Sequence, residues 1–274
     1  MGYGVVSHSA PGHGLRPCHG WLRLGSKLRR RNSPATEVHG IDSAVRLVSF
    51  NIRNGLAADG PFAWPLRRGA FLKLLAALDA DVLCLQEVLD FQLDEIGSAL
   101  ADYQYVGVGR DDAKRAGELV PIFYRGLELE RAGTFWLSET PTIPGSIAWD
   151  ARLPRICTWA EFSGLTVANL HLDHESELAR TRGIELVLGS LHAEVVCGDF
   201  NAEPEEACIK VMASAGYADL GIGQGGTFNN FRADPDDAPR IDYVFVSRPL
   251  QGTSKVVREP LVSDHMPVVA DISL

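Results

Sequence analysis

Polar side chains able to bind a cation or a phosphate follow the apolar run Val195-Val196. Asp199 and Asn201 stand two residues apart there, and Pro204 suits the first turn of a following helix. On an extended backbone, residues two apart point the same way, so this carboxylate and this amide could contact one ligand. Taken singly, Asp199 and Asn201 are more typical of turns and helix caps than of catalysis.

Other predicted strands end in polar residues of the same kind. Asn51 ends the alternating strand 44–50, Glu87 ends the apolar run 81–86, and His171 ends the strand 165–170. Asp264 and His265 precede the last strand, 268–274. Glu87 alone could be a helix-start acid, and Asp264 a turn residue. A purely structural account does not explain the whole set, because burying unpaired carboxylates is costly.

Three further residues extend this candidate site. Glu118 immediately precedes the predicted strand 120–124, and Asp242 lies near the start of the strand 240–247. Arg155 stands in the segment 133–160, whose tryptophans and prolines predict a long ordered loop packed on a pair of strands. An arginine there is commonly a surface ion-pair partner, but beside a phosphate it forms a bidentate clamp.

Helical patterns separate these strands. Pro65 opens the first helix, a second covers about 90–100, and two more carry apolar stripes over 184–191 and 208–215. Residues 1–42 lack any sustained period, and we expect a disordered basic leader followed by a single domain over 43–274.

Charge narrows the classes of partner. Residues 1–42 contribute a net +4, so the remainder carries −13 of the total of −9. An acidic body is a poor non-specific partner for nucleic acid or an anionic membrane, although acidic clusters are what hard cations require. Long duplex DNA is therefore disfavoured as a substrate.

The cysteine pattern indicates a reducing compartment, and the hydropathy indicates neither a membrane span nor a signal peptide. Five cysteines are scattered among 274 residues without a zinc-like spacing, and Cys84 and Cys197 lie in apolar runs. His171 and His174 flank Asp173, but no third ligand follows at a zinc-like distance. No apolar run approaches the length of a membrane span or a signal peptide, and we expect a cytoplasmic protein.

Six segments appear together in the order of a known family. They are Ser49-Phe50-Asn51, Leu85-Gln86-Glu87, Asn169-Leu170-His171, Gly198-Asp199-Phe200-Asn201, Arg240-Ile241-Asp242-Tyr243 and Ser263-Asp264-His265-Met266-Pro267. From about residue 45 onward the chain resembles the endonuclease/exonuclease/phosphatase superfamily. The segments 107–112, 121–124 and 153–159 resemble a bacterial subgroup of undefined substrate, which is distantly similar to deadenylase-type phosphodiesterases.

This resemblance implies a fold and a cation. The fold is a four-layer α/β sandwich, with two mostly antiparallel sheets face to face and helices outside. Glu87 would bind Mg²⁺ or Mn²⁺ with Asn51 and Asp264 helping, so that the cation neutralises phosphate charge. Asp199 would orient or deprotonate the attacking water, while Asn201, with Asn51, would hold phosphate oxygens.

The resemblance also implies roles for the remaining residues. His265, paired with Asp242, would act as a general base or as a donor to the phosphoryl group. His171 would donate to the phosphate with Glu118 supporting its ring, and Arg155 would clamp another oxygen. The structural alternative is that His265 and Asp242 form a hydrogen-bonded pair without a catalytic role.

We therefore expect a metal-dependent phosphoesterase that hydrolyses a phosphate mono- or diester by in-line attack of an activated water. Its expected partner is a phosphorylated small molecule or a short single-stranded nucleic acid, and the protein is expected to be monomeric and not membrane-bound. The alternatives are a non-catalytic scaffold relative, which predicts damaged motifs where none is found, and a DNA or RNA nuclease.

Overall fold

Two six-stranded sheets form the centre of the protein. The computed structural model describes residues 44–233 and 237–274, so the expected leader lies outside the described residues. The first sheet has the order β11 (Gln251–Val256), β12 (Val268–Ser273), β1 (Val45–Asn51), β2 (Val82–Gln86), β4 (Ile122–Tyr124) and β3 (Gln104–Val106). The second has the order β5 (Leu129–Trp136), β6 (Ile156–Phe162), β7 (Leu165–His171), β8 (Val195–Asp199), β10 (Asp242–Ser247) and β9 (Tyr217–Asp219).

Each sheet is built around one parallel pair of strands. β1 pairs with β2 in one sheet, β7 pairs with β8 in the other, and every other neighbouring pair is antiparallel. In register, Asn51 lies opposite Gln86, and His171 lies opposite Asp199. Because parallel strands end at the same edge, the polar residues that follow them are brought together.

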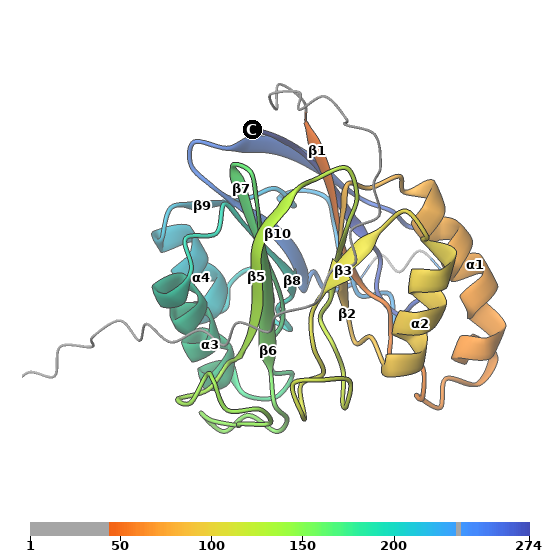
Figure 1. Ribbon diagram of the computed structural model, residues 1–274, viewed down its shortest axis with the longest axis horizontal. Helices are drawn as coiled ribbons and strands as arrows, with labels where there is room; N and C mark the ends of the chain where they lie inside the picture. Colours follow the sequence, from red (N-terminus) through yellow and green to blue (C-terminus); the bar gives the residue numbers. More distant parts are fainter. Residues whose placement is uncertain (1–43, 234–236) are drawn as a thin grey trace, which may run out of the picture.

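Helices cover the outer face of each sheet, which completes the four layers (Figure 1). The helices α1 (Trp64–Ala77) and α2 (Asp90–Ala99) lie on one side, and α3 (Glu177–Ser190) and α4 (Ala207–Ser214) on the other. A short 3₁₀ helix, η1 (Gly60–Phe62), precedes α1. Separate apolar clusters lie under each helix pair, and a third fills the space between the sheets. The predicted sandwich of two mostly antiparallel sheets is confirmed.

A buried pair of amides links the two sheets just below the strand ends. Nε2 of Gln86 donates to Oδ1 of Asn169 at 2.7 Å, and Nδ2 of Asn169 donates to the carbonyls of Leu85 and Pro121. Both side chains are fully buried, so each lost hydrogen bond would leave a polar group without water. The side-chain amides of Gln86 and Asn169 thus position one sheet on the other.

The segment 133–160 differs from its predicted form. The strand β5 runs through Trp136 and β6 begins at Ile156, so the loop between them covers residues 137–155. Trp136 and Trp159 are buried strand residues rather than loop core, and Trp149 is the tryptophan that stays in the loop. β5 is an edge strand, and its exposed Glu130 and Arg131 hide the strand pattern.

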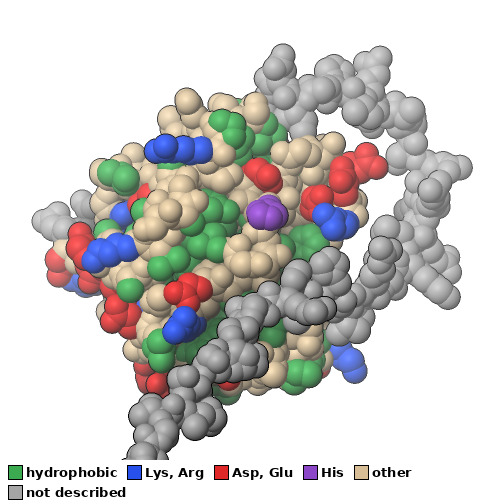
Figure 2. Space-filling view, turned by 90° about the vertical axis from the view of Figure 1, so that its left-hand side faces the viewer, with side chains coloured by type: hydrophobic (Ala, Val, Ile, Leu, Met, Phe, Trp, Pro, Cys, Tyr) green, Lys and Arg blue, Asp and Glu red, His purple; other side chains and the backbone are tan. Residues whose placement is uncertain are grey.

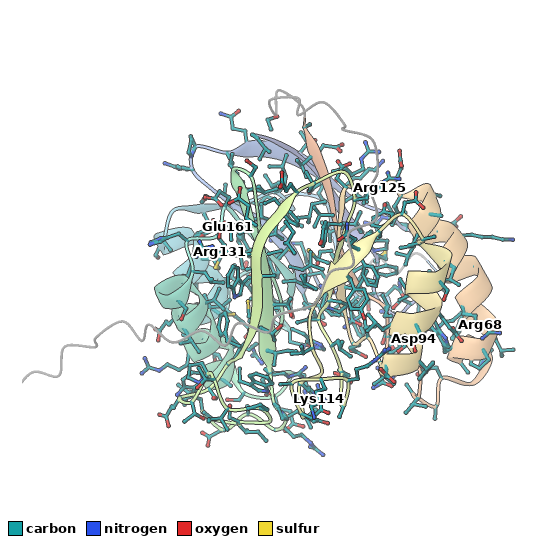
Figure 3. The ribbon with its side chains drawn as sticks, viewed as in Figure 1. Arg68, Asp94, Lys114, Arg125, Arg131 and Glu161 are labelled. Carbon is teal, nitrogen blue, oxygen red and sulfur yellow. The ribbon has the colours of Figure 1, made fainter. Side chains whose placement is uncertain are left out.

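Surface ion pairs decorate the outer strands and helices. Figure 3 shows Arg131 of β5 and Glu161 of β6 beside one another, where Nε of Arg131 donates to the carboxylate at 2.6 Å. Arg68 of α1 likewise donates to Glu95 of α2 at 2.8 Å. Exposed pairs of this type contribute about 0–1 kcal/mol each, so packing holds the layers together. Across the described residues, no helix combines the length and the apolar character that crossing a bilayer requires.

Candidate active site

The predicted site residues gather around one pocket of about 670 Å³. Its lining comes from strand ends and loops of both sheets, as the registers require. The predicted residues that line it are Glu87, Glu118, Arg155, His171, Asp199, Asn201, Asp264 and His265. The other two, Asn51 and Asp242, are fully buried and hydrogen-bond to lining residues from behind. Residues far apart in the chain thus form one site.

Asn51 joins two carboxylates from different sheets. Its Nδ2 donates to Oε1 of Glu87 and to Oδ2 of Asp199, both at 2.9 Å, and its Oδ1 accepts from the backbone N–H of Arg53. The second oxygen of Glu87 accepts from the backbone N–H of Asn54 at 2.7 Å. The amide therefore holds Glu87 and Asp199 at a fixed spacing.

Asp199 lines the pocket and is 1% exposed. Its Oδ1 accepts from the backbone N–H of Asn201 at 2.8 Å, while Nε2 of His171 lies 3.5 Å and Nε2 of His265 3.7 Å from Oδ2. Burial raises the pKa of Asp199 to about 7, against the lowering effect of His265 and with the repulsion of Asp242 adding to it. A carboxyl of this pKa can exchange a proton near neutral pH.

His265 and Asp242 form a buried pair. Nδ1 of His265 lies 2.9 Å from Oδ2 of Asp242, and Phe228 packs edge-on against the ring with the centroids 4.9 Å apart. Burial lowers the pKa of His265, but the charges of Asp242 and Asp199 outweigh it and raise that pKa to about 10. At neutral pH the ring is therefore an imidazolium, which can donate hydrogen bonds but cannot accept a proton.

Local sequence explains how two of the motifs reach this geometry. Gly198 has φ +141°, and a Cβ at that position would stand 1.9 Å from the carbonyl oxygen of Leu170. Only glycine therefore lets β8 approach β7 so closely before Asp199. Oγ of Ser263 donates to the carbonyl of Asn51 at 2.8 Å, which ties the segment before His265 to the end of β1.

Backbone strain is concentrated around the pocket. Arg53, Glu87, Asn201 and Asn230 all line it, and each has a positive φ between 47° and 60°. Asparagine tolerates this region, whereas Arg and Glu adopt it at a cost. Strained residues persist where surrounding contacts hold them, and they gather at functional sites.

Arg155, His171 and His174 line the pocket and are called the basic wall below, while Glu87 and Asp264, which also line it, are called the acidic wall. Arg155 is 6% exposed, and its Nη2 donates to Nδ1 of His174 at 2.9 Å. Its Nε lies 3.7 Å from Asp173 and has no hydrogen-bond partner among the described residues. Burial together with the charge of Arg155 lowers the pKa of His171 well below its usual value, so its ring is neutral. This wall is suited to an anion.

One detail of the prediction needs correction. The carboxylate of Glu118 accepts from Nδ2 of Asn54 at 2.9 Å and from Nη1 of Arg110 at 2.6 Å, so the contacts of its two oxygens are not with the ring of His171. The carboxylate of Asp173 accepts backbone N–H groups in the turn before α3. Short polar side chains after a strand commonly make such local bonds.

Sequence reasoning missed several groups in the pocket. Arg53 lies 3.3 Å from Asp264 and bonds both oxygens of Asp59, while His174 holds Arg155. Arg53 stands two residues after Asn51, and this closeness to the motif was the signal that the sequence offered. An apolar rim completes the lining, and it consists of Leu56, Ala57, Leu153, Phe228 and Ile241. Leu56 is 78% exposed, so nothing in the described residues covers it.

The donor set fits a hard divalent cation. The carboxylates of Glu87 and Asp264 both line the pocket, and oxygen ligands of this kind suit Mg²⁺ and Mn²⁺. Among the described residues, Asp199, Asp242 and His265 also offer ligand atoms within 4.8 Å of one another. Nδ1 of His265 is already turned to Asp242, so these two side chains are better explained as a hydrogen-bonded pair than as cation ligands.

The chain belongs to the endonuclease/exonuclease/phosphatase family, whose sequence profile matches residues 48–265. Members of this family are metal-dependent phosphoesterases and nucleases. No curated protein sequence matches the chain significantly. The expected superfamily is therefore confirmed on sequence as well as on fold.

Solved structures give the same result. A family member from Bacteroides vulgatus is 33% identical with a TM-score of 0.79, over 85% of this chain and 99% of that one. A mannosyl-6-phosphatase from Bacteroides thetaiotaomicron is 31% identical with a TM-score of 0.79, over 84% of this chain and 100% of that one. The catalytic domain of human Nocturnin is 21% identical with a TM-score of 0.63, over 84% of this chain and 94% of that one, and it shares the fold.

Proposed function

We propose that this protein is a divalent-cation-dependent phosphoric ester hydrolase whose substrate is a small phosphorylated molecule. The observation that carries the proposal is the position of Asp199. Its carboxylate lines the pocket, is joined through Asn51 to Glu87 of the acidic wall, and lies 3.5 Å from His171 of the basic wall and 3.7 Å from His265. A phosphate ester between these walls would face both a proton acceptor and cationic donors.

Asp199 is the group that would take the proton of the attacking water. Its raised pKa of about 7 makes it a stronger base than an exposed carboxylate, and bonds to Asn51 and Asn201 fix its orientation. A positioned base of this kind contributes about 10²–10⁴-fold to the rate.

His265 would act as a donor to the phosphoryl group. Its ring is cationic at neutral pH because Asp242 and Asp199 outweigh the effect of burial, so a role as general base is disfavoured. Asn201 lines the pocket beside Asp199, and its amide could contact another phosphate oxygen. Donors fixed before the reaction stabilise developing charge without reorganisation.

The basic wall would bind the remaining charge of the phosphate. Arg155 and the neutral His171 line this side, and His174 orients the guanidinium through its Nδ1. Arg155 lines the pocket and is 6% exposed, so a bound phosphate oxygen would accept from a desolvated guanidinium.

Glu87 and Asp264 would hold Mg²⁺ or Mn²⁺, with Asn51 keeping Glu87 in place. When bound, such a cation neutralises phosphate charge in the transition state. Without it, the acidic wall would repel the substrate. The chain therefore provides two carboxylates, separate from the basic wall, that can bind the ion.

A sugar phosphate is the first substrate to test. The relative from Bacteroides thetaiotaomicron that is described as a mannosyl-6-phosphatase shares 31% identity over its whole length. Charge supports a small substrate over long duplex DNA. On the face over α3 and α4, Figure 2 shows basic side chains lying apart with acidic ones among them, and the described residues of that face form no continuous basic track.

The test is release of inorganic phosphate from a panel of substrates in the presence of Mg²⁺ or Mn²⁺. The panel contains hexose 6-phosphates, nucleoside monophosphates and a 5′-labelled single-stranded oligonucleotide, each assayed with wild type and Asp199→Asn. We expect the highest kcat/KM on a hexose phosphate and its loss in the variant. Shortening of the oligonucleotide with no phosphate release would make the protein a nuclease, and inactivity on every substrate would support a scaffold role.

A further inference from the structure

We infer that Arg67 of α1 is a positioning residue that holds the two halves of the acidic wall in register. It is 5% exposed and lies behind the pocket rather than in its lining. Its catalytic consequence rests on the proposed function, whereas its structural consequence can be measured without any activity.

The guanidinium donates to four backbone carbonyls from three separate segments. Nη1 donates to Ile52 and to Val262, both at 2.8 Å. Nη2 donates to Arg53 at 2.9 Å and Nε to Phe62 at 2.9 Å. The carbonyls of Ile52 and Arg53 follow Asn51 directly, and Val262 stands two residues before Asp264. One side chain therefore joins the strand end behind Glu87 to the segment that carries Asp264.

No carboxylate hydrogen-bonds to this buried cation in the described part of the chain. Burial lowers the pKa of Arg67 to about 10, while the more distant charges of Asp264 and Asp59 raise it, so the group stays charged at neutral pH. The guanidinium is also 4.9 Å from the ring of Trp64 and 6.0 Å from that of Phe231. A desolvated arginine satisfied by carbonyls acts on the position of backbone, since its planar fork fixes several acceptors at once.

Lysine cannot replace this arrangement. Its ammonium keeps the charge but presents donors from a single atom, whereas the four carbonyls are reached from three different nitrogens of Arg67. A charge effect and a positioning effect can thus be separated. If Arg67 acted by its charge alone, methionine would let Glu87 and Asp264 attract a cation more strongly and lysine would have no effect.

The test compares Arg67→Lys and Arg67→Met with Arg125→Met. Arg125 offers a control away from the pocket, because it donates to the carbonyl of Ala80 at 3.1 Å, pairs with Asp79 and lies 5.1 Å from the ring of Tyr103. It belongs to the opposite end of the first sheet, near the start of β2 (Figure 3). Each full-length variant is first shown to be folded by circular dichroism at the temperature used.

Hydrogen exchange measured by mass spectrometry tests the structural part. We expect faster exchange in peptides that cover 52–54 and 262–265 in both Arg67 variants, with wild-type exchange there in Arg125→Met. Unchanged exchange in both segments would overturn the inference whatever the protein catalyses. If methionine prevents folding, the lysine variant alone decides the matter.

Calorimetric titration with Mg²⁺ and steady-state kinetics test the catalytic part. Outer-shell residues typically change metal affinity or activity by about 10–100-fold, and we expect a loss in this range for Arg67→Met and a smaller one for Arg67→Lys, mainly in kcat. Equal or tighter Mg²⁺ binding in Arg67→Met would contradict positioning. A wild type that neither binds Mg²⁺ nor hydrolyses any ester would refute the proposed function, and the exchange result would still decide the role of Arg67.

Discussion

Nδ1 of His265 lies 2.9 Å from Oδ2 of Asp242, while the other carboxylate oxygen of Asp242 is buried and has no hydrogen-bond partner among the described residues. Such an incomplete set of bonds is costly for a carboxylate of structural purpose alone. The pair is therefore best explained by what it does to the imidazole, which it keeps protonated and oriented toward Asp199.

Replacing Asp242 by Asn removes the charge that keeps His265 protonated. We expect kcat to fall by about 10²–10⁴-fold, since the imidazole loses both its charge and its orientation. Asp219→Asn is the control, because Asp219 pairs with Arg240 at 2.7 Å on the neighbouring strand β9. Steady-state rates decide the matter, and equal activity of both variants would make the His265–Asp242 pair purely structural.

The dependence of kcat/KM on pH follows from the two perturbed groups. Asp199 must be ionised to take a proton, and its pKa is raised to about 7, so activity falls as the pH drops through that value. His265 must be protonated to donate, and its pKa is raised to about 10, so activity falls again as the pH rises through that value. We expect a bell-shaped profile at saturating Mg²⁺, with the alkaline limb moved to lower pH in Asp242→Asn. An alkaline limb that stays in place would contradict the assignment to His265.

Binding of Mg²⁺ should stabilise the folded protein through Glu87. A ligand present at 100 times its dissociation constant stabilises the native state by about 2.7 kcal/mol, which raises Tm by several degrees. In Glu87→Gln one oxygen ligand becomes a donor, and we expect the Mg²⁺-dependent rise in Tm to disappear. Differential scanning fluorimetry measures it, with the exposed Glu185→Gln on α3 as control. If Mg²⁺ raised the Tm of Glu87→Gln as much as that of wild type, the ion would bind at another place.

Arg155 should contribute mainly to the binding of the phosphate. Removing a charge-assisted bond to a buried donor costs about 1.5–3 kcal/mol, so Arg155→Met should lose about 10–100-fold in kcat/KM. Arg152→Met is the matched control, since Arg152 lies in the same loop and forms an exposed pair with Glu175 at 2.7 Å. Inhibition by inorganic phosphate should weaken in the first variant and stay unchanged in the second. A larger loss of kcat/KM in Arg152→Met than in Arg155→Met would refute the role of Arg155 in binding the phosphate.

Close packing of β7 on β8 predicts a large effect of one methyl group. Gly198→Ala would place Cβ 1.9 Å from the carbonyl oxygen of Leu170 at a φ of +141°, so the strands must separate. Strain and overpacking of this kind cost about 3 kcal/mol or more. Gly189→Ala on α3 meets nothing within 4 Å and should stabilise by up to about 1 kcal/mol. Urea unfolding measures both, and equal stability of the two variants would contradict the packing argument.

Polar residues at the ends of apolar runs carried most of what the sequence could predict. Asn51, Glu87, His171 and Asp199 end or directly follow central strands, and the parallel pairing of those strands places them at one edge. Edge strands such as β5 and β11 were harder to predict, because β5 has a run of exposed residues at 130–132 and β11 alternates exposed residues with half-buried ones.

Side-chain partners lay beyond the sequence for a different reason. The bonds of Glu118 to Asn54 and Arg110, and of Arg67 to four carbonyls, join segments that approach one another only in the folded chain. No local spacing encodes such contacts. The pairing of Glu118 with His171 was inferred from a resemblance, and this chain supplies other partners for that carboxylate.

The measurement that tests the central claim most directly is hydrolysis of p-nitrophenyl phosphate and bis-p-nitrophenyl phosphate during a titration of Mg²⁺ after treatment with EDTA. Wild type, Asp199→Asn and His265→Ala are assayed in parallel. We predict saturable, Mg²⁺-dependent release of p-nitrophenol by wild type, strongest on the monoester, and a loss of about 10²-fold or more in both variants. If p-nitrophenol were released as fast in EDTA as in Mg²⁺, or as fast by Asp199→Asn as by wild type, a cation-dependent hydrolase centred on Asp199 would be contradicted.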